Sequence, residues 1–238
     1  GKNMMKIEIL FPEFCNLFGD IGNIKYLKEC LPNEQFIETS FQSEPAFVSE
    51  NIDFIYMGAM TERIQEKVIS KLMRHKLRII DLIEGGTVFL FTGNAIEIVG
   101  SYIEDSGRRI ECINIFDFYA KRNMMSRYNS LVLGKFKDID IVGFKTQFTM
   151  AYGNNEDNHF IKTCRGIGFN DNCSFEGIVK NNFFGTYLVA PILVLNPLFT
   201  KHLFKKMGIE SPKIAFEDEV MEAYYKRLED FRNPKIRI

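Results

Sequence analysis

The segment Val88–Gly100 could carry a reactive side chain, because an apolar strand there runs directly into a tight turn and a helix. A sharp strand-to-helix turn exposes one side chain above a sheet and points free N–H groups at an incoming carbonyl group. Amide hydrolysis at such a turn needs a nucleophile, a base, a group that orients the base, and donors for the oxyanion. The turn here contains Thr92 and Gly93. Glycine offers no nucleophile, and a threonine hydroxyl without a base is nearly inert at neutral pH.

The cysteines and histidines offer few replacements for a missing nucleophile and base. The five cysteines are odd in number and widely spaced, with no CxxC pair, so we expect neither a metal site nor a disulfide framework. Reduced thiols, no metal ion and no cofactor are the expectation. Cys15 lies beside the polar segment Asn16–Asn23 and is the one cysteine that could replace the nucleophile, although a buried structural thiol is the more frequent role for such a cysteine.

Composition and charge exclude several classes of function. The chain has 238 residues, 46% of them hydrophobic, and a formal net charge of −1. This charge gives no electrostatic reason to expect nucleic acid or an anionic membrane as a partner. The longest apolar run, Tyr187–Leu195, is far shorter than the roughly 20 residues that cross a bilayer. We therefore expect a cytoplasmic protein that forms one domain over residues 1–238.

The first half of the chain alternates short apolar runs with helical patterns. Such an order predicts right-handed crossovers and a mainly parallel sheet. Thr61 is the expected N-cap of one helix, in which Ile64, Val68 and Leu72 form an apolar stripe. The expected strands are Lys6–Phe11, Phe36–Ser40, Asp53–Met57 and Val88–Phe91, and an expected helix is Gly22–Leu31.

The second half of the chain has a different residue pattern, with strand-like runs and few helices between them. It predicts a more antiparallel half that continues the same sheet. Two amphipathic helices are expected near Pro197–Met207 and Ala215–Asp230, and residues 206–238 form a C-terminal helical extension. The expected strands are Cys112–Phe118, Ser130–Phe136, Ile139–Phe144, Phe175–Lys180 and Phe183–Tyr187.

A series of short motifs runs in order through residues 6–205. Each motif is weak by itself, and their order and spacing carry the resemblance. The chain resembles the class I glutamine amidotransferases of the CobB/CobQ type, above all the glutaminase subunit of lipid II isoglutaminyl synthase, and more distantly the amidotransferase domain of cobyric acid synthase. This resemblance implies a flavodoxin-like three-layer α/β fold. The motifs are NLFGDIGNI at Asn16–Ile24, FIYMGAMTER at Phe54–Arg63, IFDFY at Ile115–Tyr119, IVGF at Ile141–Phe144, EG at Glu176–Gly177, GTYL at Gly185–Leu188 and PILVLNP at Pro191–Pro197.

The resemblance also implies that the catalytic side chains are missing. The position of the family's cysteine falls on Gly93, or on Thr92 if one residue is inserted, and Val189 stands where the family has its histidine. Ala190 replaces the glycine that follows this histidine. The family's orienting acid matches Asp20, which is retained and whose carboxylate could simply stabilise the turn at Gly22–Asn23.

The residues around the family's glutamine pocket have changed as well. A glycine-rich turn in the relatives reads Gly58, Ala59 and Met60 here, and the added side chains are expected to crowd the backbone approach that glycine permits. The family's substrate-contacting arginine corresponds to Arg127, with Arg122 as the alternative. The candidate ligand-binding residues are Gly58, Ala59, Met60, Asn94, Arg127 and Gln147.

The sequence therefore predicts an amidotransferase-like protein without glutaminase activity that acts by binding. In the relatives this domain supplies ammonia to a Mur-ligase-like subunit that uses ATP, or is fused to a synthase, so the resemblance implies such a partner. A homo-oligomer and a small ligand in the altered cleft are the other binding roles. The alternative function is an active amidotransferase or hydrolase that supplies ammonia with a non-family nucleophile, Cys15 or Thr92.

Overall fold

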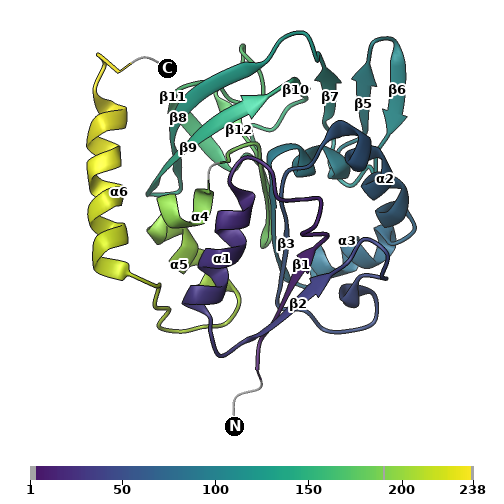
Figure 1. Ribbon diagram of the computed structural model, residues 1–238. Helices are drawn as coiled ribbons and strands as arrows, with labels where there is room; N and C mark the ends of the chain where they lie inside the picture. Colours follow the sequence, from purple (N-terminus) through teal and green to yellow (C-terminus); the bar gives the residue numbers. More distant parts are fainter. Residues whose placement is uncertain (1–3, 190, 237–238) are drawn as a thin grey trace.

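A computed structural model describes residues 4–189 and 191–236 (Figure 1). Its centre is a six-stranded sheet in the order β13-β14-β4-β3-β1-β2. All neighbouring strands are parallel except β13, which runs antiparallel to β14. The expectation of a mainly parallel sheet is therefore confirmed. The strands are β1 (Lys6–Leu10), β2 (Gln35–Thr39), β3 (Phe54–Met57), β4 (Val88–Thr92), β13 (Ile178–Lys180) and β14 (Phe183–Thr186).

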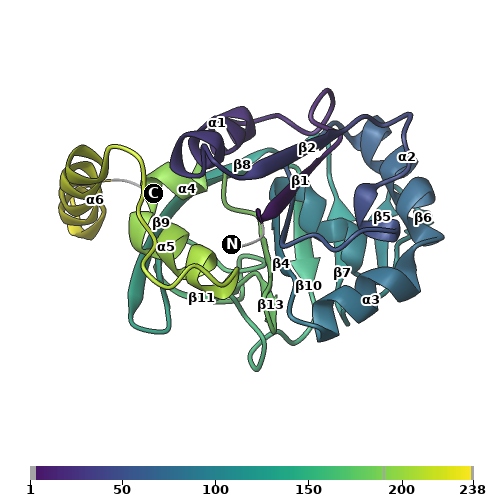
Figure 2. The same cartoon turned by 90° about the horizontal axis from the view of Figure 1, so that it is seen from below.

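Helices cover both faces of this sheet, which makes the three layers visible in the view from below (Figure 2). Alternate strand residues face opposite layers: Tyr56 and Leu90 pack against one set of helices, and Met57 and Phe91 against the other. The first layer contains α1 (Asp20–Cys30), α4 (Ile192–Leu195) and α5 (Pro197–Lys206), and the second contains α2 (Glu62–Met73) and α3 (Lys76–Glu84).

Most of the second half forms two further sheets rather than continuing the central one, so that part of the expectation is wrong. Only β13 and β14 of the second half join the parallel sheet. The additional sheets have the orders β10-β7-β5-β6 and β12-β11-β8-β9. Their strands are β5 (Tyr102–Asp105), β6 (Arg108–Glu111), β7 (Tyr119–Arg122), β8 (Tyr128–Phe136), β9 (Ile139–Gln147), β10 (Thr149–Tyr152), β11 (Ile161–Arg165) and β12 (Phe175–Glu176).

The strand expected over Cys112–Phe118 is also absent, and its backbone has other partners. The N–H group of Ile113 donates to Ile98, and those of Ile115 and Phe116 both donate to Val99. The apolar residues of this segment thus wrap around the turn that follows β4, which an alternating pattern cannot distinguish from a strand.

The C-terminal helices are found close to their expected positions. Helix α6 (Glu217–Arg232) has three acidic residues in its first turn and lies along the outer edge of the molecule, at the left of Figure 1. It packs Tyr224 and Leu228 against β8 and β9. In the part of the chain that the structure describes, no helix is both long enough and apolar enough to cross a membrane.

Candidate functional site

The site lies at the carboxyl end of β4, where the expected sharp turn is present. All five residues of β4 are buried, and Gly93 follows with a φ of +60°. Glycine adopts this left-handed conformation without the steric cost that other residues meet. The following helix is the 3₁₀ helix η2 (Gly93–Val99).

Three segments distant in the sequence meet at Gly93. A Cβ atom added to Gly93 would lie 2.6 Å from the Cβ of Ala59 and 3.4 Å from the Cγ1 of Val189. Ala59 follows β3, and Val189 follows β14. The N–H group of Val189 donates a hydrogen bond to the carbonyl oxygen of Phe144. The structure therefore brings together the three positions at which the resemblance implies a lost side chain or a lost glycine. Ala190, the neighbouring replacement, lies outside the described residues.

Asp20 lies fully buried beneath this turn and does not stabilise a turn at Gly22–Asn23, because it begins α1 instead. One carboxylate oxygen accepts from the N–H group of Ala59 at 2.5 Å, and the other from the hydroxyl of Thr92 at 2.9 Å. The Asn23 amide donates to it at 3.2 Å. Burial raises the pKa of Asp20 to about 6, although these hydrogen bonds lower it in part.

Thr92 is poorly placed to act as a nucleophile. Its side chain is fully buried, and its hydroxyl donates to Asp20 and lies 3.4 Å from the hydroxyl of Tyr56. A hydroxyl that faces the first helical layer in this way does not point toward the turn at Gly93.

Two backbone donors of the Gly58–Met60 turn are already occupied. The N–H group of Ala59 donates to Asp20, and that of Met60 donates to the side-chain oxygen of Asn94 at 3.0 Å. The Asn94 amide in turn donates to the carbonyl oxygen of Met60 at 2.8 Å. An oxyanion next to this turn would have to displace these side-chain partners before it could use either donor.

Two cavities open beside the turn. The inner pocket has a volume of about 100 Å³ and is lined by Gly93, Asn94 and Tyr187 among others. The outer cleft has a volume of about 930 Å³ and is lined in part by Arg122 and Arg127. Gln147 lines both cavities and lies in the wall between them. Cavities that hold small-molecule ligands usually measure roughly 300–1,000 Å³, so only the outer cleft falls in that range.

The two candidate arginines have different environments. Arg122 is buried and donates to Asp105 at 3.0 Å and to Gln65 at 2.8 Å. Arg127 is exposed, donates twice to the hydroxyl of Thr146, and has its guanidinium group near the rings of Phe18 and Phe148. Of the two, Arg127 is the one that a ligand in the outer cleft can reach.

The buried acid Glu97, in the wall of the inner pocket, was not among the residues predicted from the sequence. It accepts from the hydroxyl of Tyr187 at 2.6 Å and from the Gln65 amide at 2.8 Å. Burial raises the pKa of Glu97 to about 7, opposed by these hydrogen bonds and by the positive charge of Arg122. A charged residue within the apolar run AIEIV was the signal that could have found it.

We expect Glu97 to make the protein less stable as the pH rises. Its folded-state pKa of about 7 lies above the ordinary value of 4.5, so the folded state binds the extra proton between these values. The contribution of Glu97 to the free energy of unfolding is fully present near pH 4. By pH 8 the protein has lost this contribution, on the order of 1–3 kcal/mol. Urea unfolding at pH 5 and pH 8 measures this, and Glu97→Gln should reduce the difference, leaving the part that comes from the raised pKa of Asp20. An unchanged pH dependence in that variant would contradict the assignment.

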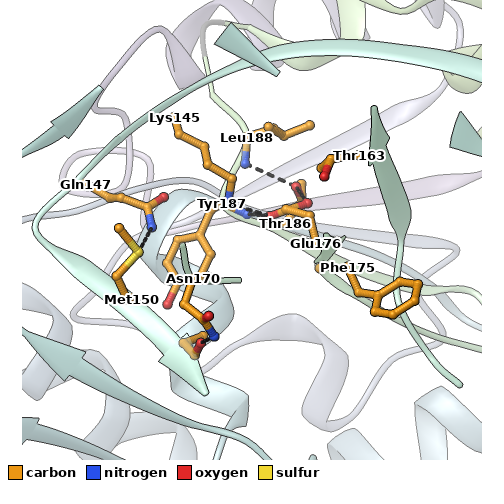
Figure 3. Close-up of polar contacts among 12 residues, drawn as sticks. Lys145, Gln147, Met150, Thr163, Asn170, Phe175, Glu176, Thr186, Tyr187 and Leu188 are labelled. Carbon is orange, nitrogen blue, oxygen red and sulfur yellow. Dashed lines mark hydrogen bonds and ion pairs between the residues drawn. The ribbon is translucent and has the colours of Figure 1, made fainter. Parts of the chain in front are cut away.

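A buried ion pair of Glu176 and Lys145 holds the backbone next to Tyr187 (Figure 3). The sequence motif contained Glu176 but did not predict this pair. Glu176 accepts from the Thr186 hydroxyl at 2.7 Å and from the Tyr187 N–H group at 2.8 Å. The ammonium group of Lys145 lies 3.4 Å away, and both charged side chains are inaccessible to solvent. Burial lowers the pKa of Lys145, whereas Glu176 opposes this shift. The pair fixes a wall of the inner pocket and does not touch Gly93.

Cys15 lies near the site, as expected, but is buried. Its thiol donates to the sulfur of Met60 at 3.8 Å, and burial together with the charge of Asp20 raises its pKa far above the ordinary value. A thiol of this kind is not ionised near neutral pH and is a poor nucleophile.

Within residues 4–189 and 191–236, no group of His, Cys, Asp and Glu side chains could hold a metal ion.

Solved structures with a similar fold include proteins described as glutamine amidotransferases. A structure described as a glutamine amidotransferase superposes with a TM-score of 0.57 at 10% identity, covering 85% of this chain and 99% of its own. PurLQS from Thermotoga maritima gives 0.56 at 12% identity, covering 95% and 100%. At this identity the likeness shows the fold alone. The chain thus has the flavodoxin-like fold of the class I glutamine amidotransferases.

Two curated proteins are similar in sequence, although no protein-family model matches the chain. Both are named lipid II isoglutaminyl synthase (glutamine-hydrolyzing) subunit GatD. The Staphylococcus aureus (strain N315) protein is 28% identical over 214 residues, covering 87% of this chain and 85% of its own length. The Streptococcus pneumoniae (strain R6) protein is 26% identical over 235 residues, covering 92% and 90%. The chain is thus similar to both GatD subunits over most of its length.

Proposed function

We propose that this GatD-like protein does not hydrolyse glutamine and acts instead by binding. The observation that carries the proposal is the packing at Gly93. The volume that a nucleophilic side chain at this turn would need is filled by Ala59, and the position opposite is occupied by Val189, which can accept no proton. This packing supports the proposal, and so does the engagement of the N–H groups of Ala59 and Met60 by Asp20 and Asn94.

The proposal predicts no ammonia or glutamate release above background when the purified protein is incubated with glutamine. Loss of an entire catalytic unit removes most of the rate enhancement, since its members act together. A glutamine-dependent rate that disappears in Gly93→Ala or Val189→Ala variants would contradict the proposal. A known active GatD assayed in parallel confirms that the assay detects turnover.

A non-family nucleophile is the alternative, and its two candidates are both shielded. Cys15 and Thr92 are buried, and each is engaged by a hydrogen bond within the protein. We therefore expect no covalent adduct after incubation with a glutamine-like electrophile, measured by the mass of the intact protein. An adduct mapped to either residue would favour an active amidotransferase.

Partner binding is the second part of the proposal. Both curated relatives are named as subunits, which supports a subunit role for this chain. We propose that it stabilises a Mur-ligase-like synthetase subunit, with a homo-oligomer as the alternative assembly. Co-purification from the native host followed by light scattering separates the two: a heteromeric mass supports the first, and a multiple of the 27.6 kDa chain mass supports the second.

A further inference from the structure

The outer cleft has the size and the lining of a binding site for more than a single amino acid. Its volume of about 930 Å³ is at the upper end of the range for small-molecule sites. Methionine and aromatic side chains form much of its wall, and such residues are enriched where proteins bind peptides and other proteins. These apolar residues are Met124, Met125, Met150, Tyr128, Phe148 and Tyr152.

The charges of the outer cleft leave one cation and one anion without a partner. Lys121 pairs with Glu104 at 3.9 Å, and Arg122 pairs with Asp105 at 3.0 Å. Among the described residues, no carboxylate forms an ion pair with Arg127, and no cation forms one with Asp171. The hydroxyl of Thr146 occupies Nε and Nη2 of Arg127, which leaves Nη1 for a ligand.

Two buried polar atoms in the wall are also without partners. The Nε atom of Arg122 and the Oε1 atom of Gln147 are both inaccessible to solvent and make no hydrogen bond within the described residues. A buried polar group without a partner costs about 1–3 kcal/mol, so Arg122 and Gln147 form a locally strained part of the wall.

We propose that the outer cleft binds a short peptide with free termini, whose carboxylate lies at Arg127 and whose ammonium group lies at Asp171. Peptides of three and four residues test two lengths, because each residue of an extended chain adds at most about 3.3–3.6 Å. The methionine and aromatic side chains then contact an apolar residue in the middle of the peptide. This inference rests on the proposed binding role, and it places the ligand in the outer cleft rather than in the pocket at Gly93.

Isothermal titration with L-alanyl-L-leucyl-L-alanine, and with the tetrapeptide extended by one alanine, tests the proposal. The unmodified peptide should bind, and N-acetylation or C-amidation should each weaken binding about tenfold or more, because each removes one charge-assisted hydrogen bond. Arg127→Leu should abolish the effect of amidation, and Asp171→Asn that of acetylation. The matched controls Arg74→Leu, at the far end of α2, and Asp157→Asn should change nothing.

Several outcomes would overturn the proposal. They are no binding of either peptide, capped peptides that bind as tightly as the unmodified one, or an unchanged affinity for the unmodified peptide in both variants. Binding of free glutamine but of no peptide would also contradict it. The glutamine hydrolysis assay is independent of these results. Hydrolysis would refute the proposed function, whereas an inactive protein that ignores the peptides would refute this inference alone.

Discussion

Replacing Gly93 by alanine is expected to lower the free energy of unfolding by about 2–5 kcal/mol. Two costs add: an alanine with a φ of +60° is strained by about 1–2 kcal/mol, and overpacking costs about 1–3 kcal/mol. The overpacking arises because the new Cβ atom would lie 2.6 Å from the Cβ atom of Ala59. Urea unfolding monitored by circular dichroism measures the loss.

Two further variants separate these costs. Gly107 has a φ of +81° with nothing within 4 Å of an added Cβ atom, so Gly107→Ala measures the backbone strain alone. Adding Ala59→Gly to the Gly93→Ala protein should remove the overpacking and leave a loss similar to that of Gly107→Ala. If Gly93→Ala and Gly107→Ala cost the same, Ala59 does not fill the space above the turn.

The same packing explains why a cysteine alone would not restore the reaction. The thiol of a Gly93→Cys variant meets Ala59 first and finds Val189 in the place of a base. A side chain at Gly93 is therefore coupled by contact to the side chains of Ala59 and Val189.

Removing the carboxylate of Glu176 is expected to destabilise the protein by about 3–5 kcal/mol, the usual cost when one member of a buried ion pair is lost. Glu176→Leu leaves the ammonium group of Lys145 buried without its carboxylate, and it also leaves the N–H group of Tyr187 without its acceptor. Thermal and urea unfolding measure the effect.

The double variant with Lys145→Met provides the decisive comparison. With both charges gone, the total loss should be smaller than the sum of the single losses, since neighbouring groups couple by about 0.5–3 kcal/mol. The exposed pair of Lys28 and Glu38 is the control, and Glu38→Ala should change stability by no more than about 0.5 kcal/mol. Additive single losses would show that Lys145 and Glu176 do not stabilise each other.

Local patterns in the sequence were sufficient for the elements that depend on neighbouring residues. The apolar run of β4 predicted a central strand, and the expected N-cap Thr61 does accept from the N–H group of Ile64 at 3.3 Å. The pattern over Cys112–Phe118 was misleading, because its apolar residues are buried around η2 rather than in a sheet. A buried strand and a buried irregular segment have the same apolar composition, and only long-range contacts distinguish them.

By itself, the sequence determined the class of fold and the absence of a cysteine and a histidine at two expected places. The motifs recur in order along one chain, and no folding is needed to see that Gly93 and Val189 lack reactive groups. Only the tertiary structure decided that these residues meet Ala59 at one point, that Asp20 is engaged by Thr92, and that the larger cavity lies outside the turn. The reason is physical: side-chain type is written in the sequence, whereas contact between residues about 30 to 100 positions apart arises from how the parallel strands align their carboxyl ends.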